Sequence, residues 1–205
     1  NRLTLLRGDG ESDLVLGEDW RPLAFSGGGT VEAGELVFAG YGILAPGEGD
    51  FPAYDSYAEL DVTDKWVLVF RYLPEDLSPE HRQYLHEYAD LRFKAMVARD
   101  KGARGLVIAS GPTSRVTEQL VTLESETGAG GGSLPVVSVS DAVASDLLVA
   151  ASKEPETVQE VLDAGEPQAG FALPGVQIAA DIRLDKQTDT DRNVLGRLYA
   201  SDRPG

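Results

Sequence analysis

The sequence predicts an α+β fold: a β-barrel or sandwich of about seven strands with flanking helices. Short apolar runs, several of them bounded by glycine, recur along the 205 residues and are typical of strands. Segments with helix-start signals lie between these runs. Apolar residues make up 42% of the chain, so it can bury a sizeable core.

The strands are predicted from apolar runs that end at turn residues. The run KWVLVF at 65–70 is apolar after its first residue, which is typical of a strand buried on both faces. About seven of the predicted segments would build the barrel or sandwich. Strands are expected at 3–6, 14–16, 20–25, 35–39, 65–70, 104–109, 134–139, 176–184 and 193–199.

The helices are predicted from their caps. Ser78, Pro79 and Glu80 supply a cap, a proline at the first helical position and an acid at the positive dipole end. One helix is expected over 78–101, ended by Gly102. Further helices are expected over 140–151 and 155–164, with Gly165 after the second, and a single helical turn over 56–59 that begins with a capping box.

The charge excludes several classes of partner. Eighteen Lys and Arg residues against 34 Asp and Glu give a net charge of −16. Such a chain is repelled by nucleic acid and by anionic lipid. No apolar run approaches the roughly 18 residues of a membrane helix, so we expect no membrane insertion. The absence of cysteine excludes disulfides and cysteine-based metal sites.

A long connection over 110–133 has no predicted element. Its glycine run at 128–132 precedes a strand and lacks a lysine, which favours a flexible tether over a phosphate-binding loop. Connections of this length inside a domain are usually functional or mobile. We therefore treat it as a candidate contact loop, with these representative residues: Ser110, Gly111, Pro112, Gly130 and Gly131.

Two clusters on the predicted 78–101 helix and just after it have alternative interpretations. His86 and Asp90 lie four residues apart, with Glu87 between them, so they could form part of a metal site. No third ligand follows, and a solvated or salt-bridged helix face explains them as well. A local charge of +4 could complement the helix dipole or bind an acidic partner. It comes from Arg92, Lys94, Arg99, Lys101 and Arg104 against Asp100.

Several short motifs follow one another along the sequence: LVFAGYGI at 36–43, YDSYAELDV at 54–62, KWVLV at 65–69, Lys94-Ala95, KGARGLVI at 101–108 and LPVVSV at 134–139. Taken in order, these motifs resemble the protease-associated (PA) domain. The closest similarity is to the version inserted in co-catalytic zinc aminopeptidases of the leucyl-aminopeptidase and glutamate-carboxypeptidase type. Two departures are visible: Asp64 stands where the family usually has Gly, and Ser56 where a second Asp is common.

The resemblance implies structural motif residues and neither a catalytic residue nor a metal ligand in this chain. Zinc is instead expected in a peptidase domain that the chain lacks, and no cofactor is expected here. The structural residues are Gly40, Tyr41, Gly42, Tyr54, Asp55, Tyr57, Asp61, Lys65, Gly102 and Ala103.

The resemblance also implies an organisation and a function. Residues 1–34 would lead into the insert, 35–165 would form the PA core, and 166–205 would return to the peptidase domain. The domain would cap the active-site cleft of an extracytoplasmic zinc exopeptidase, with the parent peptidase domain in cis and a peptide or protein substrate as partners. A peptide-binding module of the sorting-receptor type is an alternative. A stand-alone metallohydrolase based on His86 and Asp90 is another.

Overall fold

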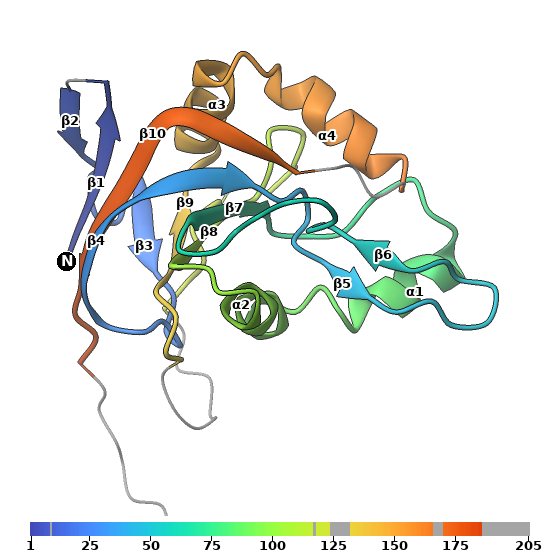
Figure 1. Ribbon diagram of the computed structural model, residues 1–205. Helices are drawn as coiled ribbons and strands as arrows, with labels where there is room; N and C mark the ends of the chain where they lie inside the picture. Colours follow the sequence, from blue (N-terminus) through green and yellow to red (C-terminus); the bar gives the residue numbers. More distant parts are fainter. Residues whose placement is uncertain (9, 117, 124–131, 166–169, 186–205) are drawn as a thin grey trace, which may run out of the picture.

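The computed structural model describes residues 1–8, 10–116, 118–123, 132–165 and 170–185, and it shows a mixed α+β fold. One curled eight-stranded sheet and one two-stranded sheet replace the predicted barrel or sandwich of about seven strands (Figure 1). The large sheet has the order β2-β1-β10-β4-β7-β8-β9-β3. Its strands are β1 (Arg2–Arg7), β2 (Gly10–Asp13), β3 (Trp20–Pro22), β4 (Gly29–Phe38), β7 (Trp66–Phe70), β8 (Gly105–Ala109), β9 (Val136–Val139) and β10 (Phe171–Ile182).

Four neighbouring strands of this sheet, β4, β7, β8 and β9, run parallel. The two central strands, β7 and β8, contain no polar side chain and are buried along their whole length, because both faces of the sheet are covered there. Trp66, Leu68 and Phe70 belong to one hydrophobic cluster, which includes side chains of α3 and α4. Val67 and Val69 belong to a second cluster, which includes side chains of α2. Figure 1 shows α3 and α4 on one side of the sheet and α2 on the other.

The predicted 78–101 helix is two helices, α1 (Pro79–His86) and α2 (Leu91–Asp100). The start is confirmed, because the Ser78 hydroxyl accepts a hydrogen bond from the His81 N–H at 3.2 Å. The chain is interrupted at Asp90, whose carboxylate accepts from the N–H groups of Arg92 and Phe93 at 2.8 and 3.2 Å. An aspartate that caps the next turn competes with continuation of the preceding helix. The apolar residues keep their helical spacing across this interruption, so the sequence pattern predicts one continuous helix.

The helices that follow β9 are predicted well. Ser140 caps α3 (Asp141–Ala150) by accepting from the Val143 N–H, and α4 (Pro155–Asp163) is followed by Gly165 with φ +89°. Residues 56–59 form a turn, but the capping box predicted to begin it is wrong. The Ser56 hydroxyl accepts from the Ile43 N–H at 3.0 Å, and thereby joins that turn to the segment after β4.

Of the predicted strands, one is wrong and one lies outside the described residues. The predicted strand 14–16 is wrong, because β2 ends at Asp13, and Val15 and Leu16 are exposed in the turn that follows. The predicted strand 193–199 lies outside the described residues. The remaining strands are observed with shifted ends: β10 begins five residues earlier than predicted, and β4 begins six residues earlier.

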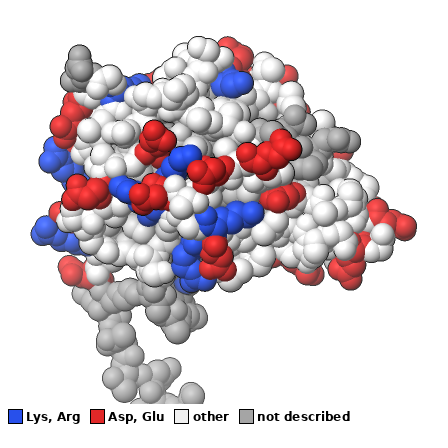
Figure 2. All heavy atoms as spheres, in the orientation of Figure 1, with Lys and Arg blue, Asp and Glu red and all other residues white. Residues whose placement is uncertain are grey.

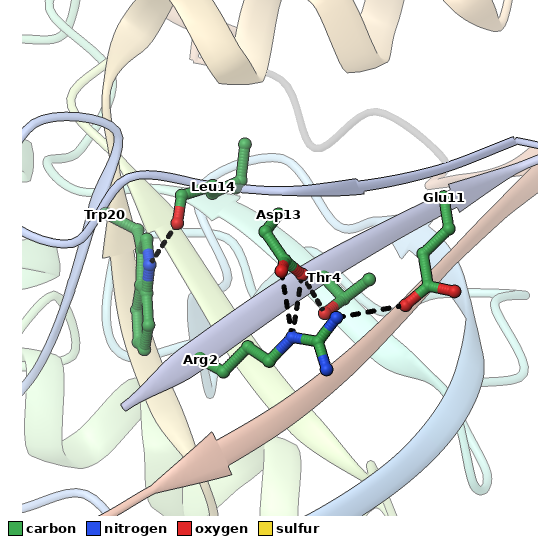
Figure 3. A network of polar contacts seen from close by, with 6 residues as sticks. All are labelled: Arg2, Thr4, Glu11, Asp13, Leu14 and Trp20. Carbon is green, nitrogen blue, oxygen red and sulfur yellow. Dashed lines mark hydrogen bonds and ion pairs between the residues drawn. The ribbon is translucent and has the colours of Figure 1, made fainter.

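The β1–β2 hairpin at the sheet edge is held by a polar network (Figure 3). The Arg2 guanidinium donates to the Asp13 carboxylate at 2.9 and 3.0 Å, and the Thr4 hydroxyl donates to the same carboxylate at 2.7 Å. The Trp20 indole N–H donates to the Leu14 carbonyl at 3.2 Å. Because β1, β2, β3 and the start of β4 belong to the large sheet, the first 34 residues supply strands of the same sheet as the rest of the domain.

A separate small hairpin, β5 (Leu44–Ala45) and β6 (Tyr54–Asp55), lies beside α1 at one end of the molecule (Figure 1). Phe51, in the loop between these strands, stacks on His81 and Tyr84 of α1 with ring centroids 5.3 and 5.1 Å apart. Among the described residues, no helix is long and apolar enough to cross a membrane.

Candidate binding surfaces

The carboxyl ends of β4, β7, β8 and β9 meet at one edge of the sheet because these strands are parallel. Such an edge is the usual place for a ligand in an open α/β sheet. Gly40, Tyr41 and Gly42 follow β4, and Ser110 and Gly111 follow β8. Five of the residues singled out in the sequence therefore lie near this edge.

Gly40 and Gly42 turn the chain sharply after β4. Their φ angles of +51° and +63° lie in the left-handed region, which favours glycine. A Cβ atom on Gly42 would lie 2.8 Å from Cγ1 of Val69, and one on Gly40 would lie 3.0 Å from Cδ2 of Leu162. The glycines thus allow the turn to approach both β7 and α4 closely.

Tyr41, between these glycines, is fully buried and ties the turn to α4. Its hydroxyl donates to Asp163 Oδ1, which also accepts from the Glu75 N–H at 3.2 Å. Gln159 Nε2 lies 3.5 Å from the Tyr41 hydroxyl and donates to it. Burial raises the pKa of Tyr41 far above its usual range and also raises the pKa of Asp163. The network therefore joins a neutral phenol to the Asp163 carboxyl group, and the phenol O–H is one of the hydrogen-bond donors to that carboxyl.

A second network closes the end of β8. The buried Asp141 carboxylate accepts from the Gly111 N–H at 2.8 Å, and the Asp141 N–H donates to Gln119 Oε1 at 2.8 Å. The Thr113 N–H donates to Gln159 Oε1 at 3.0 Å, which connects this network to the first. Burial raises the pKa of Asp141. The edge of the sheet is therefore occupied by the protein's own side chains.

This second network changes the expectation for the candidate contact loop. Ser110 and Gly111 are buried, so they cannot touch a partner directly in this conformation, whereas Pro112 is half-buried. Gly130 and Gly131 lie outside the described residues. The part of the loop that could serve as a contact surface therefore starts beyond Gly111.

Lys94 is fully buried and closes the end of β7. Its ammonium donates to the carbonyls of Phe70, Arg71 and Tyr72 at 2.9, 2.9 and 2.7 Å. Burial lowers the pKa of Lys94 well below its ordinary value, while the three carbonyls match the three N–H groups of the charged form. Sequence analysis missed this role, although Lys94 lies at helical spacing between Leu91 and Ala98, on the apolar face.

The other motif residues hold turns or fill the core. Tyr54 and Tyr57 are buried, and neither hydroxyl has a hydrogen-bond partner among the described residues. Asp55 accepts from the Tyr57 N–H at 2.8 Å, and Asp61 forms an ion pair with Lys65 at 3.3 Å in the segment before β7. These residues shape the segments between β5 and β7.

Gly102 and Ala103 end α2. Gly102 has φ +82°, its N–H donates to the Arg99 carbonyl, and the Ala103 N–H donates to the Ala98 carbonyl at 3.0 Å. This pair of bonds is the Schellman arrangement that satisfies carbonyls at a helix end.

Asp64, one of the two departures from the PA pattern, has φ +59° and so adopts the conformation that glycine favours. The Arg104 guanidinium donates to both Asp64 carboxylate oxygens at 3.0 and 2.6 Å. It also donates to the carbonyls of Glu32 and Ala33 at 3.0 and 2.8 Å. The aspartate therefore keeps the turn and adds a link between the segments that precede β7 and β8.

The basic residues around α2 do not form a free patch, because each is engaged within the chain. Arg99 pairs with Asp100 at 2.8 Å, and Lys101 lies over the Tyr57 ring at 5.2 Å. Arg92 lies over the Phe25 ring at 4.7 Å, and Lys94 and Arg104 make the contacts described above. Figure 2 shows basic and acidic side chains interspersed on the visible face. The hypothesis of a basic surface for an acidic partner is therefore not supported.

The positions of His86 and Asp90 do not support the metal hypothesis. His86 ends α1 and Asp90 caps α2, so the two residues do not share a helical face. The Asp90 carboxylate is already used by two backbone N–H groups. Across the described part of the chain, no group of three or more His, Asp or Glu side chains is arranged to hold a metal ion.

Within the described part of the chain, hollows open on the surface at two places beside the helices. One, of about 330 Å³, lies between α4 and the start of β10. The other, of about 420 Å³, lies beside α1 and is lined mainly by polar side chains, with Arg82, Gln83, His86 and Glu87 around Leu73. The first has the more apolar lining of the two. Its described lining residues are Phe38, Gly40, Ser152, Lys153, Glu154, Thr157, Val158, Val161, Leu162 and Phe171.

Comparison with known protein families matches residues 31–147, more than half of the chain, to the PA domain. The chain belongs to the PA domain family. The predicted resemblance to this family is thereby confirmed. PA domains are generally non-catalytic accessory domains associated with proteases. This PA domain matches no curated protein sequence.

Among solved structures, the PA domain is similar to a peptidase M28 precursor from Shewanella amazonensis. The two chains are 15% identical, with a TM-score of 0.42. The similarity covers 88% of this chain and 33% of the other, so this chain spans about a third of that protein.

Proposed function

We propose that this PA domain is the non-catalytic accessory domain of a zinc exopeptidase of the aminopeptidase or glutamate-carboxypeptidase type. In that role it caps the active-site cleft and contacts peptide or protein substrates. The observation that carries the proposal is the family match over 31–147, joined to the ordered motifs from Leu36 to Val139. The zinc and the catalytic groups belong to a peptidase domain in cis, and the enzyme is extracytoplasmic.

The contacts of the ionisable side chains support an accessory role. Lys94, Asp141 and Asp163, whose pKa values are shifted by burial, each bind backbone groups of a neighbouring segment. Shifted pKa values often mark catalytic groups. Here the same shifts accompany groups that hold the segments after β7 and β8 in place.

The test compares the full-length protein with the 205-residue chain alone. We expect the full-length protein to contain zinc by elemental analysis and to hydrolyse aminoacyl or peptidyl substrates, and the isolated chain to do neither. Zinc content and hydrolysis are the two readouts. A full-length protein without a peptidase domain would overturn the proposal and favour a peptide-binding module of the sorting-receptor type.

The capping role has its own test in the full-length protein. Removal of residues 124–131 should change KM for long peptides more than KM for dipeptides, because a cap is contacted only by extended substrates. The melting temperature of the PA domain serves as the control for folding. Equal effects on short and long substrates would argue against a cap.

A further inference from the structure

The hollow between α4 and β10 is a surface feature that the core networks leave unused. We propose that it docks a polypeptide segment that presents a large apolar side chain next to a lysine or arginine. The proposal rests on the proposed role in substrate contact and names the chemistry of the contacted peptide. The volume of the hollow, about 330 Å³, lies at the small end of the roughly 300–1,000 Å³ range of ligand pockets. A single large side chain suits this size.

The apolar side chains of the hollow come from three elements. Phe38 from β4 and Phe171 from β10 lie with ring centroids 5.1 Å apart, and Leu162 of α4 is buried beside them. Val161 of α4 also lines the hollow and remains 44% exposed. An exposed apolar side chain at the mouth of an apolar hollow gains free energy when a partner covers it.

The rim of the hollow is fixed by the turn that joins α3 to α4. Ser152 adopts φ +59°, and the Lys153 N–H donates to the Leu148 carbonyl at 3.0 Å. The Lys153 ammonium lies 4.7 Å from the centre of the Phe171 ring. The rim is thus held in place before any partner arrives, which lowers the ordering cost of binding.

The charge around the hollow selects a cationic partner. In the segment 141–165, which forms α3, α4 and their connection, Asp141 and Asp163 belong to the core networks. The exposed charged residues are four acids, Asp146, Glu154, Glu156 and Glu160, and one lysine, Lys153, which lines the hollow. Glu154 lines the hollow, and its carboxyl lies against that of Glu156, an arrangement that raises the pKa of Glu154. A lysine or arginine beside the inserted side chain would pair with these carboxylates, and the net charge of −16 would attract it from a distance.

The experiment measures binding of rhodamine-labelled Gly-Gly-Phe-Arg-Gly-Gly amide to the full 205-residue chain by fluorescence anisotropy. Two relatives of this probe carry Ala in place of Phe or Glu in place of Arg. We expect both relatives to bind at least about tenfold more weakly, because each lacks one of the two recognised groups. Equal binding of the three peptides, or no binding of any, would overturn the proposal.

Paired variants locate the binding site. Val161→Gln should weaken binding about tenfold, whereas Val149→Gln, at a 57% exposed valine of α3 outside the hollow, should leave it unchanged. The double change Glu154→Gln and Glu156→Gln should weaken binding about fivefold at low salt. Glu80→Gln, in the first turn of α1, is its control.

All these positions are exposed, so folding should survive, and the melting temperature checks this. Equal affinities of Val161→Gln and Val149→Gln would exclude the hollow. Because zinc content and hydrolysis belong to the full-length protein, failure of peptide binding would leave the accessory function standing, and the reverse also holds.

Discussion

At the scale of the residue, buried polar side chains form hydrogen bonds with backbone groups that lie outside the sheet ladders. Lys94 binds three carbonyls after β7, and Asp141 binds the Gly111 N–H after β8. Tyr41 joins the turn after β4 to Asp163. Buried backbone groups outside a sheet ladder must find such partners, because an unpaired one costs about 1–3 kcal/mol.

Lys94→Met should lower the free energy of unfolding by about 3 kcal/mol or more, because three carbonyls lose their donor in a buried place. Urea denaturation followed by circular dichroism measures the change. Lys153→Met, at an exposed lysine, should cost less than about 1 kcal/mol. Similar losses in the two variants would show that the buried ammonium contributes little.

Gly42→Ala should lower the free energy of unfolding by about 2–4 kcal/mol, because it adds left-handed strain and a close contact with Val69. Gly49→Ala is the matched control. Its φ is +57°, but its Cβ would meet no atom within 4 Å, so strain alone applies. Thermal or urea unfolding that gives equal losses for both variants would contradict the close contact.

At the scale of the element, two features differ from the expected pattern, and each has a side-chain cause. The helix predicted over 78–101 is interrupted because Asp90 caps α2. The turn before β7 uses an aspartate in a glycine conformation because Arg104 supplies an ion pair.

Asp90→Ala should lower the free energy of unfolding by about 1 kcal/mol, the usual cost of losing a helix N-cap. His86→Ala should change it little, because His86 is exposed at the end of α1. Elemental analysis should find no zinc bound in proportion to the chain in either variant or in the unmodified chain. Zinc that disappears in both variants would restore the metal hypothesis.

Asp64→Ala and Asp64→Gly separate the two roles of the aspartate. Both variants lose the ion pair with Arg104, but alanine keeps the left-handed strain that glycine avoids. The glycine variant should therefore be more stable than the alanine variant by about 1 kcal/mol in urea unfolding. Equal stability would show that the left-handed turn does not survive the loss of the ion pair.

At the scale of the whole molecule, the acidic surface dominates the electrostatics. A net charge of −16 makes the compact state repel itself, and this repulsion is screened by salt. The same charge attracts the cationic peptides proposed for the hollow at α4.

Raising NaCl from about 20 mM to about 200 mM should increase the melting temperature by about 2–5 °C, because screening relieves the repulsion. Differential scanning calorimetry measures the shift. Potassium chloride should act equally if the effect is screening rather than specific ion binding. A melting temperature that falls with salt would mean that attractive ion pairs, such as Arg104 with Asp64, outweigh the repulsion.

The local features of this protein can be predicted from its sequence. The apolar runs within 65–70 and 104–109 predict buried strands because neither face can be left in water. The caps at Ser78 and Ser140 and the stops at Gly102 and Gly165 depend on nearest neighbours in the chain. The PA motifs follow from the same local patterns.

Contacts between segments that are distant in the chain are set by tertiary packing. Lys94 binds the Tyr72 carbonyl 22 positions away, and Tyr41 binds Asp163 122 positions away. The curled eight-stranded sheet likewise pairs strands that are not consecutive in the sequence. Ser56 could cap a helical turn by its local sequence, but it binds the Ile43 N–H instead. Local patterns specify the conformations that a segment can adopt, whereas packing against distant segments selects among them, and the hollow at α4 exists only after that selection.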